Sequence, residues 1–90
     1  MAVDIVTQIL NKIPGDDWEK VMGGGGLGIP WSLLEEIQRY STDAEKNCAC
    51  ADYYVNCHPK AEWKHLTIIL YLKKEFGAAR ESKSFTSTGK

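Results

Sequence analysis

This chain has no long apolar run, no regular cysteine framework and no strong excess of charge. Its longest uninterrupted apolar segment covers only residues 68–72, whereas a helix that spans a bilayer needs about 20 residues. Residues 1–10 do not combine a basic region with an apolar stretch, as a secretory signal peptide does. Three cysteines are an odd number for a disulfide scaffold, so we expect a reduced, cytoplasmic protein without membrane insertion.

The small net charge also excludes a general attraction to nucleic acid. Eleven basic and twelve acidic side chains leave a formal net charge of −1, so electrostatic recognition would have to come from local patches. A chain of 90 residues forms one domain and buries roughly 60–65% of its unfolded surface. A deep catalytic cleft would compete with the core for the same side chains.

What the chain does contain is helical periodicity. No segment alternates with period two for long enough to form a strand, whereas apolar residues recur at three-and-four spacing throughout. The sequence therefore predicts an all-α fold whose helices cover residues 3–13, a segment opened by Asp16 or Asp17, and residues 30–40, 42–56, 60–76 and 78–83. Residues 84–90 are rich in Ser, Thr, Gly and Lys, so we expect a domain over residues 1–83 followed by a disordered tail.

Local signals indicate where these helices begin and end. Thr42 with Glu45, and Asp16 with Glu19, have the spacing of a capping box, and Pro30 suits a first helical position. The glycines at 23–26 predict a flexible joint, because each glycine costs a helix about 1 kcal/mol relative to alanine. Gly77 is expected to interrupt the helix before it.

The cluster most suggestive of chemistry consists of Cys48, Cys50, Cys57 and His58. Structural zinc needs four converging ligands, yet Cys48 and Cys50 would lie about 200° apart around a helix. We therefore interpret Cys50 and Cys57 as small core residues and Cys48 as a surface residue. The glycine run lacks the Lys-Ser/Thr of a phosphate-binding loop, and no spacing suggests a catalytic triad. We expect no enzyme activity, no cofactor and no small-molecule substrate.

Surplus apolar residues are the candidates for a partner surface. Ile68, Tyr71 and Leu72 exceed what one face of an amphipathic helix can hide. We favour burial for Ile68 and Leu72, on the interpretation that the helix over 60–76 is central. For Trp31, burial and exposure remain equally open. Exposed apolar groups rimmed by charge would indicate a binding site for another protein.

Several landmarks are shared with a known family: Trp18, Leu27-Gly28-Ile29, Ile37, and the series Ala61, Trp63, Leu66 and Leu70. Their order and spacing resemble the death domain, a branch of the death-fold superfamily of six-helix antiparallel bundles. There are three departures from the family pattern. Tyr53 stands where the family has a tryptophan, Cys50 where it has a leucine, and the glycine run lengthens the step from Trp18 to Leu27.

The resemblance implies a non-enzymatic module that docks with other death-fold domains, a second copy of this chain among the candidates, in apoptotic, NF-κB or innate immune signalling. Such modules use three pairs of surfaces. The candidate partner-binding residues are Asp43 and Lys46 with Asp17 and Lys20; His58 and Lys60 with Lys73 and Lys74; and, in the third pair, Trp31, Glu35 and Arg39. Oppositely charged patches on one bundle would allow head-to-tail stacking.

Two other functions remain open from the sequence. One is a small helical domain that binds zinc or nucleic acid. The other is a regulatory domain cut from a larger receptor or enzyme, since the tail resembles the start of a linker.

Overall fold

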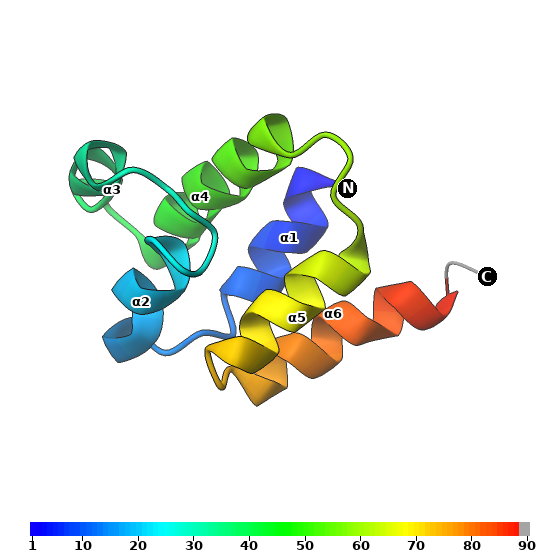
Figure 1. Cartoon of the computed structure of the whole chain (residues 1–90). Coiled ribbons are helices and arrows are strands. Elements are labelled where there is room, and N and C mark those ends of the chain that lie inside the picture. The colour runs from blue at the N-terminus through cyan, green and yellow to red at the C-terminus, as the bar shows by residue number, and fades with distance from the viewer. Residues whose placement is uncertain (89–90) are drawn as a thin grey trace.

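The computed structural model describes residues 1–88, with the side chains of residues 1–85. Within residues 1–88 it contains six α-helices and no strand (Figure 1), which confirms the all-α prediction. The helices are α1 (Val3–Leu10), α2 (Trp18–Met22), α3 (Trp31–Ile37), α4 (Asp43–Cys57), α5 (Trp63–Leu72) and α6 (Phe76–Thr88), with a 3₁₀ turn, η1 (Gly15–Asp17), before α2.

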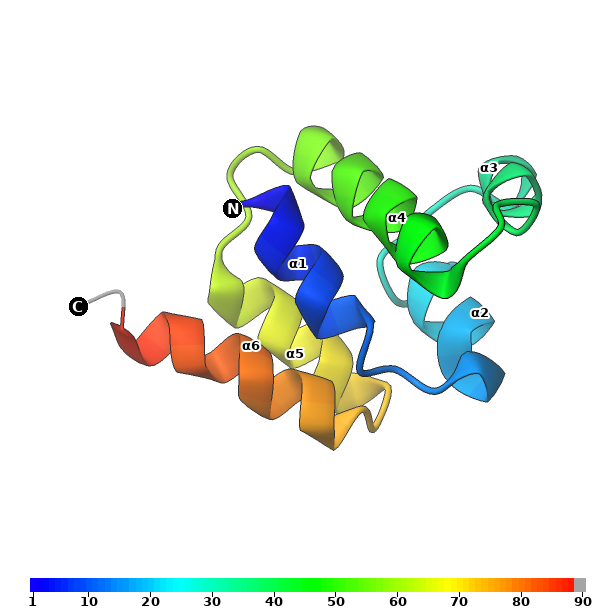
Figure 2. The same ribbon diagram turned by 180° about the vertical axis from the view of Figure 1, so that it is seen from behind.

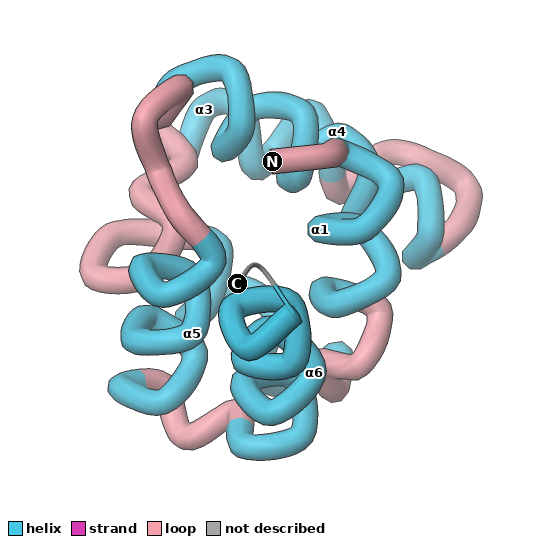
Figure 3. Tube along the Cα trace, turned by 90° about the vertical axis from the view of Figure 1, so that its right-hand side faces the viewer, coloured by secondary structure: helices cyan, strands magenta, loops and turns pink. Residues whose placement is uncertain are grey.

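Helix α1 packs against both α4 and α6 and lies between them (Figures 1 and 2). Helices α5 and α6 pack along each other, and their contacts pair Thr67 with Ser82 and Trp63 with Phe85, so they run antiparallel. In the side view of Figure 3, the α5–α6 pair occupies the opposite part of the molecule from α3 and α4.

One hydrophobic core joins all six helices. Its largest fully buried side chains are Val6, Ile9, Leu10, Val21, Met22, Leu27, Leu34, Ile37, Cys50, Leu66 and Leu70. Leu34 and Ile37 are three positions apart on α3, so they share one side of the helix, and both are buried. Trp18 and Trp63 pack against this core and are only partly buried.

The start of α4 confirms one predicted capping box. The Thr42 hydroxyl accepts a hydrogen bond from the Glu45 backbone N–H at 3.1 Å, and the Glu45 carboxylate accepts one from the Thr42 N–H at 3.2 Å. The capping box predicted for Asp16 and Glu19 is wrong. Asp16 lies inside η1, and the start of α2 has no side-chain cap. Pro30 is the N-cap residue of α3, one position before its first helical residue.

The glycine run is an ordered turn instead of the expected flexible joint. The Leu27 N–H donates to the Val21 carbonyl at 2.8 Å, and the Ile29 N–H donates to the Met22 carbonyl at 2.9 Å. A Cβ on Gly26 would lie 2.0 Å from the Val21 carbonyl oxygen, so no other residue fits this position without moving the backbone. These bonds fold the chain back onto α2 and bring Leu27 and Ile29 into the core.

A continuous helix over residues 60–76 is the largest error of the sequence-based prediction. Helix α5 ends at Leu72, and the Lys74 and Glu75 N–H groups donate to the carbonyls of Tyr71 and Leu70 at 3.0 and 2.8 Å. This is the Schellman pattern, in which glycine usually takes the left-handed position. Here Lys74 takes it, with φ of 62°. The helix break therefore lacks its usual glycine signal.

Helix α6, which follows this turn, also differs from the prediction. Gly77, predicted to interrupt a helix, lies in the first turn of α6. The helix continues through Thr88, so the stretch 84–88 of the predicted tail is helical, while residues 89–90 lie outside the described part. Two other helices end earlier than predicted, α1 at Leu10 and α3 at Ile37.

Candidate interaction surfaces

The charges of this chain are divided along its length. Residues 1–59 carry nine acidic and four basic side chains, a net charge of −5, whereas residues 60–90 carry three acidic and seven basic ones, a net charge of +4. Because α5 and α6 pack side by side, the basic residues of these two helices and their turn gather on one part of the bundle: Lys64, Lys73, Lys74, Arg80 and Lys83. The small total charge therefore conceals two oppositely charged regions.

The first predicted surface pair is largely occupied by contacts within the chain. The Lys20 ammonium lies 3.5 Å from the Asp17 carboxylate and 3.9 Å from Glu75. Lys46 and Asp43 pair with each other at 3.8 Å. The structure thus brings Asp17 and Lys20 to Glu75 in the α5–α6 turn. Their charges are partly neutralised before any partner arrives.

Glu75 is the buried member of that cluster, with 7% of its surface exposed. Desolvation raises the pKa of its carboxyl above the usual value, and the hydrogen bond and repulsion from Asp17 raise the pKa further, while the Lys20 charge lowers it. This site was missed by the sequence reasoning. The only available signal was an acidic residue following two lysines, and that pattern is not specific.

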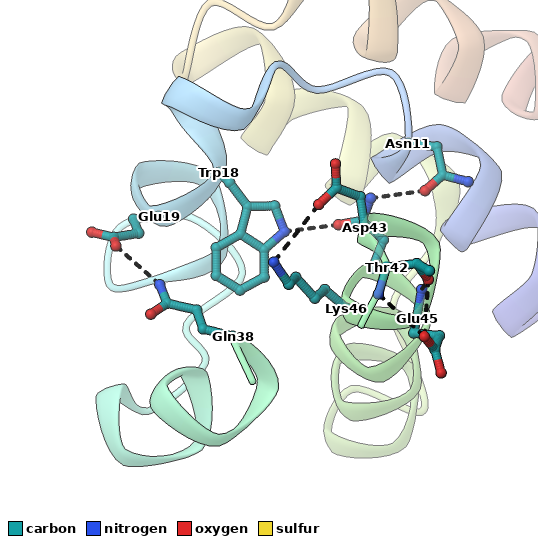
Figure 4. Close-up of polar contacts among 9 residues, drawn as sticks. Asn11, Trp18, Glu19, Gln38, Thr42, Asp43, Glu45 and Lys46 are labelled. Atoms are coloured by element: carbon teal, nitrogen blue, oxygen red, sulfur yellow. Dashed lines mark hydrogen bonds and ion pairs between the residues drawn. The ribbon is translucent and has the colours of Figure 1, made fainter. Parts of the chain in front are cut away.

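A second polar cluster lies around Trp18 (Figure 4). The Trp18 indole N–H donates to the Asn47 side-chain oxygen at 2.8 Å, and the Asn47 amide donates to the Asn11 side-chain oxygen at the same distance. These bonds join α2, α4 and the end of α1 beside a hollow of about 850 Å³. Asp43 and Lys46, two of the predicted binding residues, line this hollow. Asn11 and Asn47 were not predicted.

The second predicted surface pair consists of two basic halves. His58 and Lys60 line an apolar pocket of about 490 Å³ that also includes Leu27, Pro59 and Ile69. Lys74 is exposed at the α5–α6 turn and Lys73 is partly buried. Because both halves carry lysines, contact between them in two copies of this chain would be opposed by charge repulsion.

The third predicted surface is accessible. Glu35 and Arg39 are exposed, and Trp31 has 54% of its surface exposed, which resolves the open question about its burial. Tyr40, just beyond the helix, is 46% exposed. Exposed Trp31, Arg39 and Tyr40 are of the residue types enriched at protein-binding patches.

The prediction that Ile68 and Leu72 are buried is wrong. They are 54% and 72% exposed, because α6 covers only one side of α5 and the opposite side faces outward. Tyr71 and Phe76 extend this apolar area across the α5–α6 turn, with ring centroids 6.1 Å apart. Phe76 was not predicted as a surface residue.

The cysteines occupy different environments. Cys50 is buried, as predicted, and desolvation raises the pKa of its thiol to about 12. Cys48 is exposed as predicted, but Cys57 is exposed where burial was expected, because the inward stripe of α4 runs through Asn47, Cys50, Ala51 and Tyr54. Among the described residues, no group of three or more His, Cys, Asp or Glu side chains could hold a metal ion.

Comparisons with models of protein families, with curated proteins and with solved structures found no match for this chain. In the described part, none of the helices has both the length and the apolar character needed to cross a membrane. The class that the fold itself defines is an all-α bundle of six helices within residues 1–88.

Proposed function

We propose that this protein is a non-enzymatic interaction module of the death-fold class. It docks with other death-fold domains and so assembles cytoplasmic signalling complexes of the apoptotic, NF-κB or innate immune type. The same role would suit a regulatory domain of a larger receptor or adaptor.

The observation that carries this proposal is the convergence of the family landmarks on one core. Leu27, Ile29 and Ile37 are buried together with Leu66 and Leu70, although these residues come from well-separated segments of the chain. Their common burial is what the family resemblance implies for these positions. One of the three departures has a structural explanation, since the glycine run that lengthens the spacing is folded back onto α2.

The surface is consistent with docking. The exposed Trp31 on α3 has an acidic neighbour, Glu35. The exposed Leu72 at the end of α5 has a basic neighbour, so the two apolar surfaces are bordered by charges of opposite sign. Such contacts are individually weak and gain strength when they are repeated across an assembly.

Binding of the purified chain to a panel of purified death-fold domains tests the proposal. We expect at least one partner to bind with a Kd of about 1–100 μM, the range of weak, repeatable contacts. A helical bundle of similar size and charge from outside the class serves as the control. If the folded chain binds none of the panel at about 100 μM, the proposed function is wrong.

A further inference from the structure

The α5–α6 hairpin presents an apolar surface surrounded by unpaired positive charge. We call it the basic face and define it by Ile68, Leu72, Lys74, Phe76 and Arg80, all of which are exposed. Between residues 63 and 80 the only acidic side chain is Glu75, which is buried. Neither Lys74 nor Arg80 forms an ion pair with a described residue. Their charges remain available to a partner.

Helix α3 presents the opposite composition. We call this surface the acidic face and define it by Trp31, Glu35, Glu36, Arg39 and Tyr40, which are all exposed, so the face carries a net charge of −1. Trp31 and Glu35 are four residues apart and therefore share one side of the helix. No ion pair links Glu35 or Glu36 to another residue of the described part.

The two faces lie on separate parts of the molecule. Figures 1 and 2 both place α2 between α3 and the turn that joins α5 to α6, and Figure 3 places α3 and the α5–α6 pair on opposite parts. One copy can therefore use both faces at the same time, each with a different neighbour.

We infer that the basic face of one copy docks on the acidic face of a second copy. This inference rests on the proposed function and names the partner as the chain itself. Trp31 and Tyr40 would meet the apolar groups of the hairpin, and the amphipathic Trp ring also attracts cations such as Lys74 and Arg80. Glu35 and Glu36 would neutralise the same cations.

This pairing differs from the contacts that the family resemblance implies. In the family's second pair of surfaces, the end of α5 of one domain meets the turn before α5 of another. Between two copies of this chain, that contact would bring Lys73 and Lys74 against Lys60. The acidic face removes that repulsion. Because the two contacting surfaces are different, the contact is heterologous, and repeated copies form an open stack or a ring instead of a closed dimer.

Sedimentation velocity of the full chain between about 10 μM and 1 mM tests the inference, a range that covers weak contacts. The wild-type mass should rise with concentration and fall as salt is added, because salt screens the charges. The variants E35K/E36K and K74E/R80E should each weaken association by at least about tenfold, since like charges then face each other. The variant D4K/D16K makes the same change in net charge as E35K/E36K at exposed residues outside both faces, and it should associate like the wild type.

Mixing the two face variants gives the sharpest result. E35K/E36K retains the basic face and K74E/R80E retains the acidic face, and the two reversed surfaces are again opposite in charge, so the mixture should associate although neither variant does so alone. A wild-type chain that stays monomeric, an E35K/E36K variant that associates normally, or a mixture that fails to pair would each overturn the inference. None of these results would affect binding to the panel of other death-fold domains, so the two proposals can fail separately.

Discussion

The Trp18 indole N–H donates a hydrogen bond to the side-chain oxygen of Asn47, 2.8 Å away and 29 positions along the chain. This contact ties α2 to α4, and through Asn11 it reaches the end of α1. Asn47 is 4% exposed, so neither of its bonds can easily be replaced by water. The position of α2 therefore depends on a polar contact as well as on apolar packing.

Replacing this asparagine should be costly. Asn47→Ala removes both bonds and leaves the Trp18 N–H and the Asn11 side chain without their partner, so we expect a loss of about 1–3 kcal/mol in the free energy of unfolding. Urea denaturation followed by tryptophan fluorescence measures it. Asn56→Ala, on an exposed position of the same helix, should change stability by no more than about 0.5 kcal/mol. Equal effects of the two variants would contradict the role given to Asn47.

Two leucines of α5 provide a matched test of its orientation. Leu70 is fully buried, whereas Leu72 is 72% exposed. Leu70→Ala should destabilise the fold by about 2–5 kcal/mol, because it leaves a cavity, and Leu72→Ala should stay within about 0.5 kcal/mol. Thermal unfolding of the two variants distinguishes them. A strongly destabilised L72A would mean that α5 is turned differently.

Two glycines of the 23–26 run should respond in opposite ways to alanine. A Cβ at Gly26 would lie 2.0 Å from the Val21 carbonyl oxygen, while one at Gly24 would meet nothing within 4 Å. Gly26→Ala should cost more than about 1 kcal/mol, because the backbone must move, and Gly24→Ala should be neutral or stabilising by up to about 1 kcal/mol. Denaturation midpoints provide the measurement. If the run were a flexible joint, both variants would behave alike.

Glu75 should make stability dependent on pH. Its folded-state pKa is raised above the ordinary value of 4.5, chiefly by desolvation, so the folded protein holds this proton more tightly than the unfolded chain. Stability from this group is fully present below pH 4.5 and is lost as the pH rises through the folded-state pKa. In Glu75→Gln that decline should disappear, as followed by denaturation at a series of pH values. An unchanged decline would exclude Glu75 as its source.

Local sequence patterns predicted part of this structure well. The capping box of Thr42 and Glu45 depends on residues three apart, so it forms wherever the helix forms. The same holds for Leu34 and Ile37, whose spacing places both on one side of α3. These features need no knowledge of distant segments.

The candidate site could be predicted only in outline. Trp31, Glu35 and Arg39 are exposed on α3, yet nothing local indicated that Asp17 and Lys20 would be held against Glu75, more than fifty residues later. Long-range ion pairs depend on which elements meet. The charged surfaces that face outward therefore differ from those expected from the sequence, because Lys20 is paired within the chain with Asp17 and Glu75.

By itself, the sequence determined that the chain forms amphipathic helices and where several of them begin, because these depend on spacing and capping within a few residues. The tertiary structure decided which sides of those helices are covered. It places Ile68 and Leu72 outward, holds Lys74 in a left-handed turn through the carbonyls of Leu70 and Tyr71, and buries Glu75. Periodicity identifies an apolar side, but only the packing of neighbouring helices determines how much of that side is hidden from water.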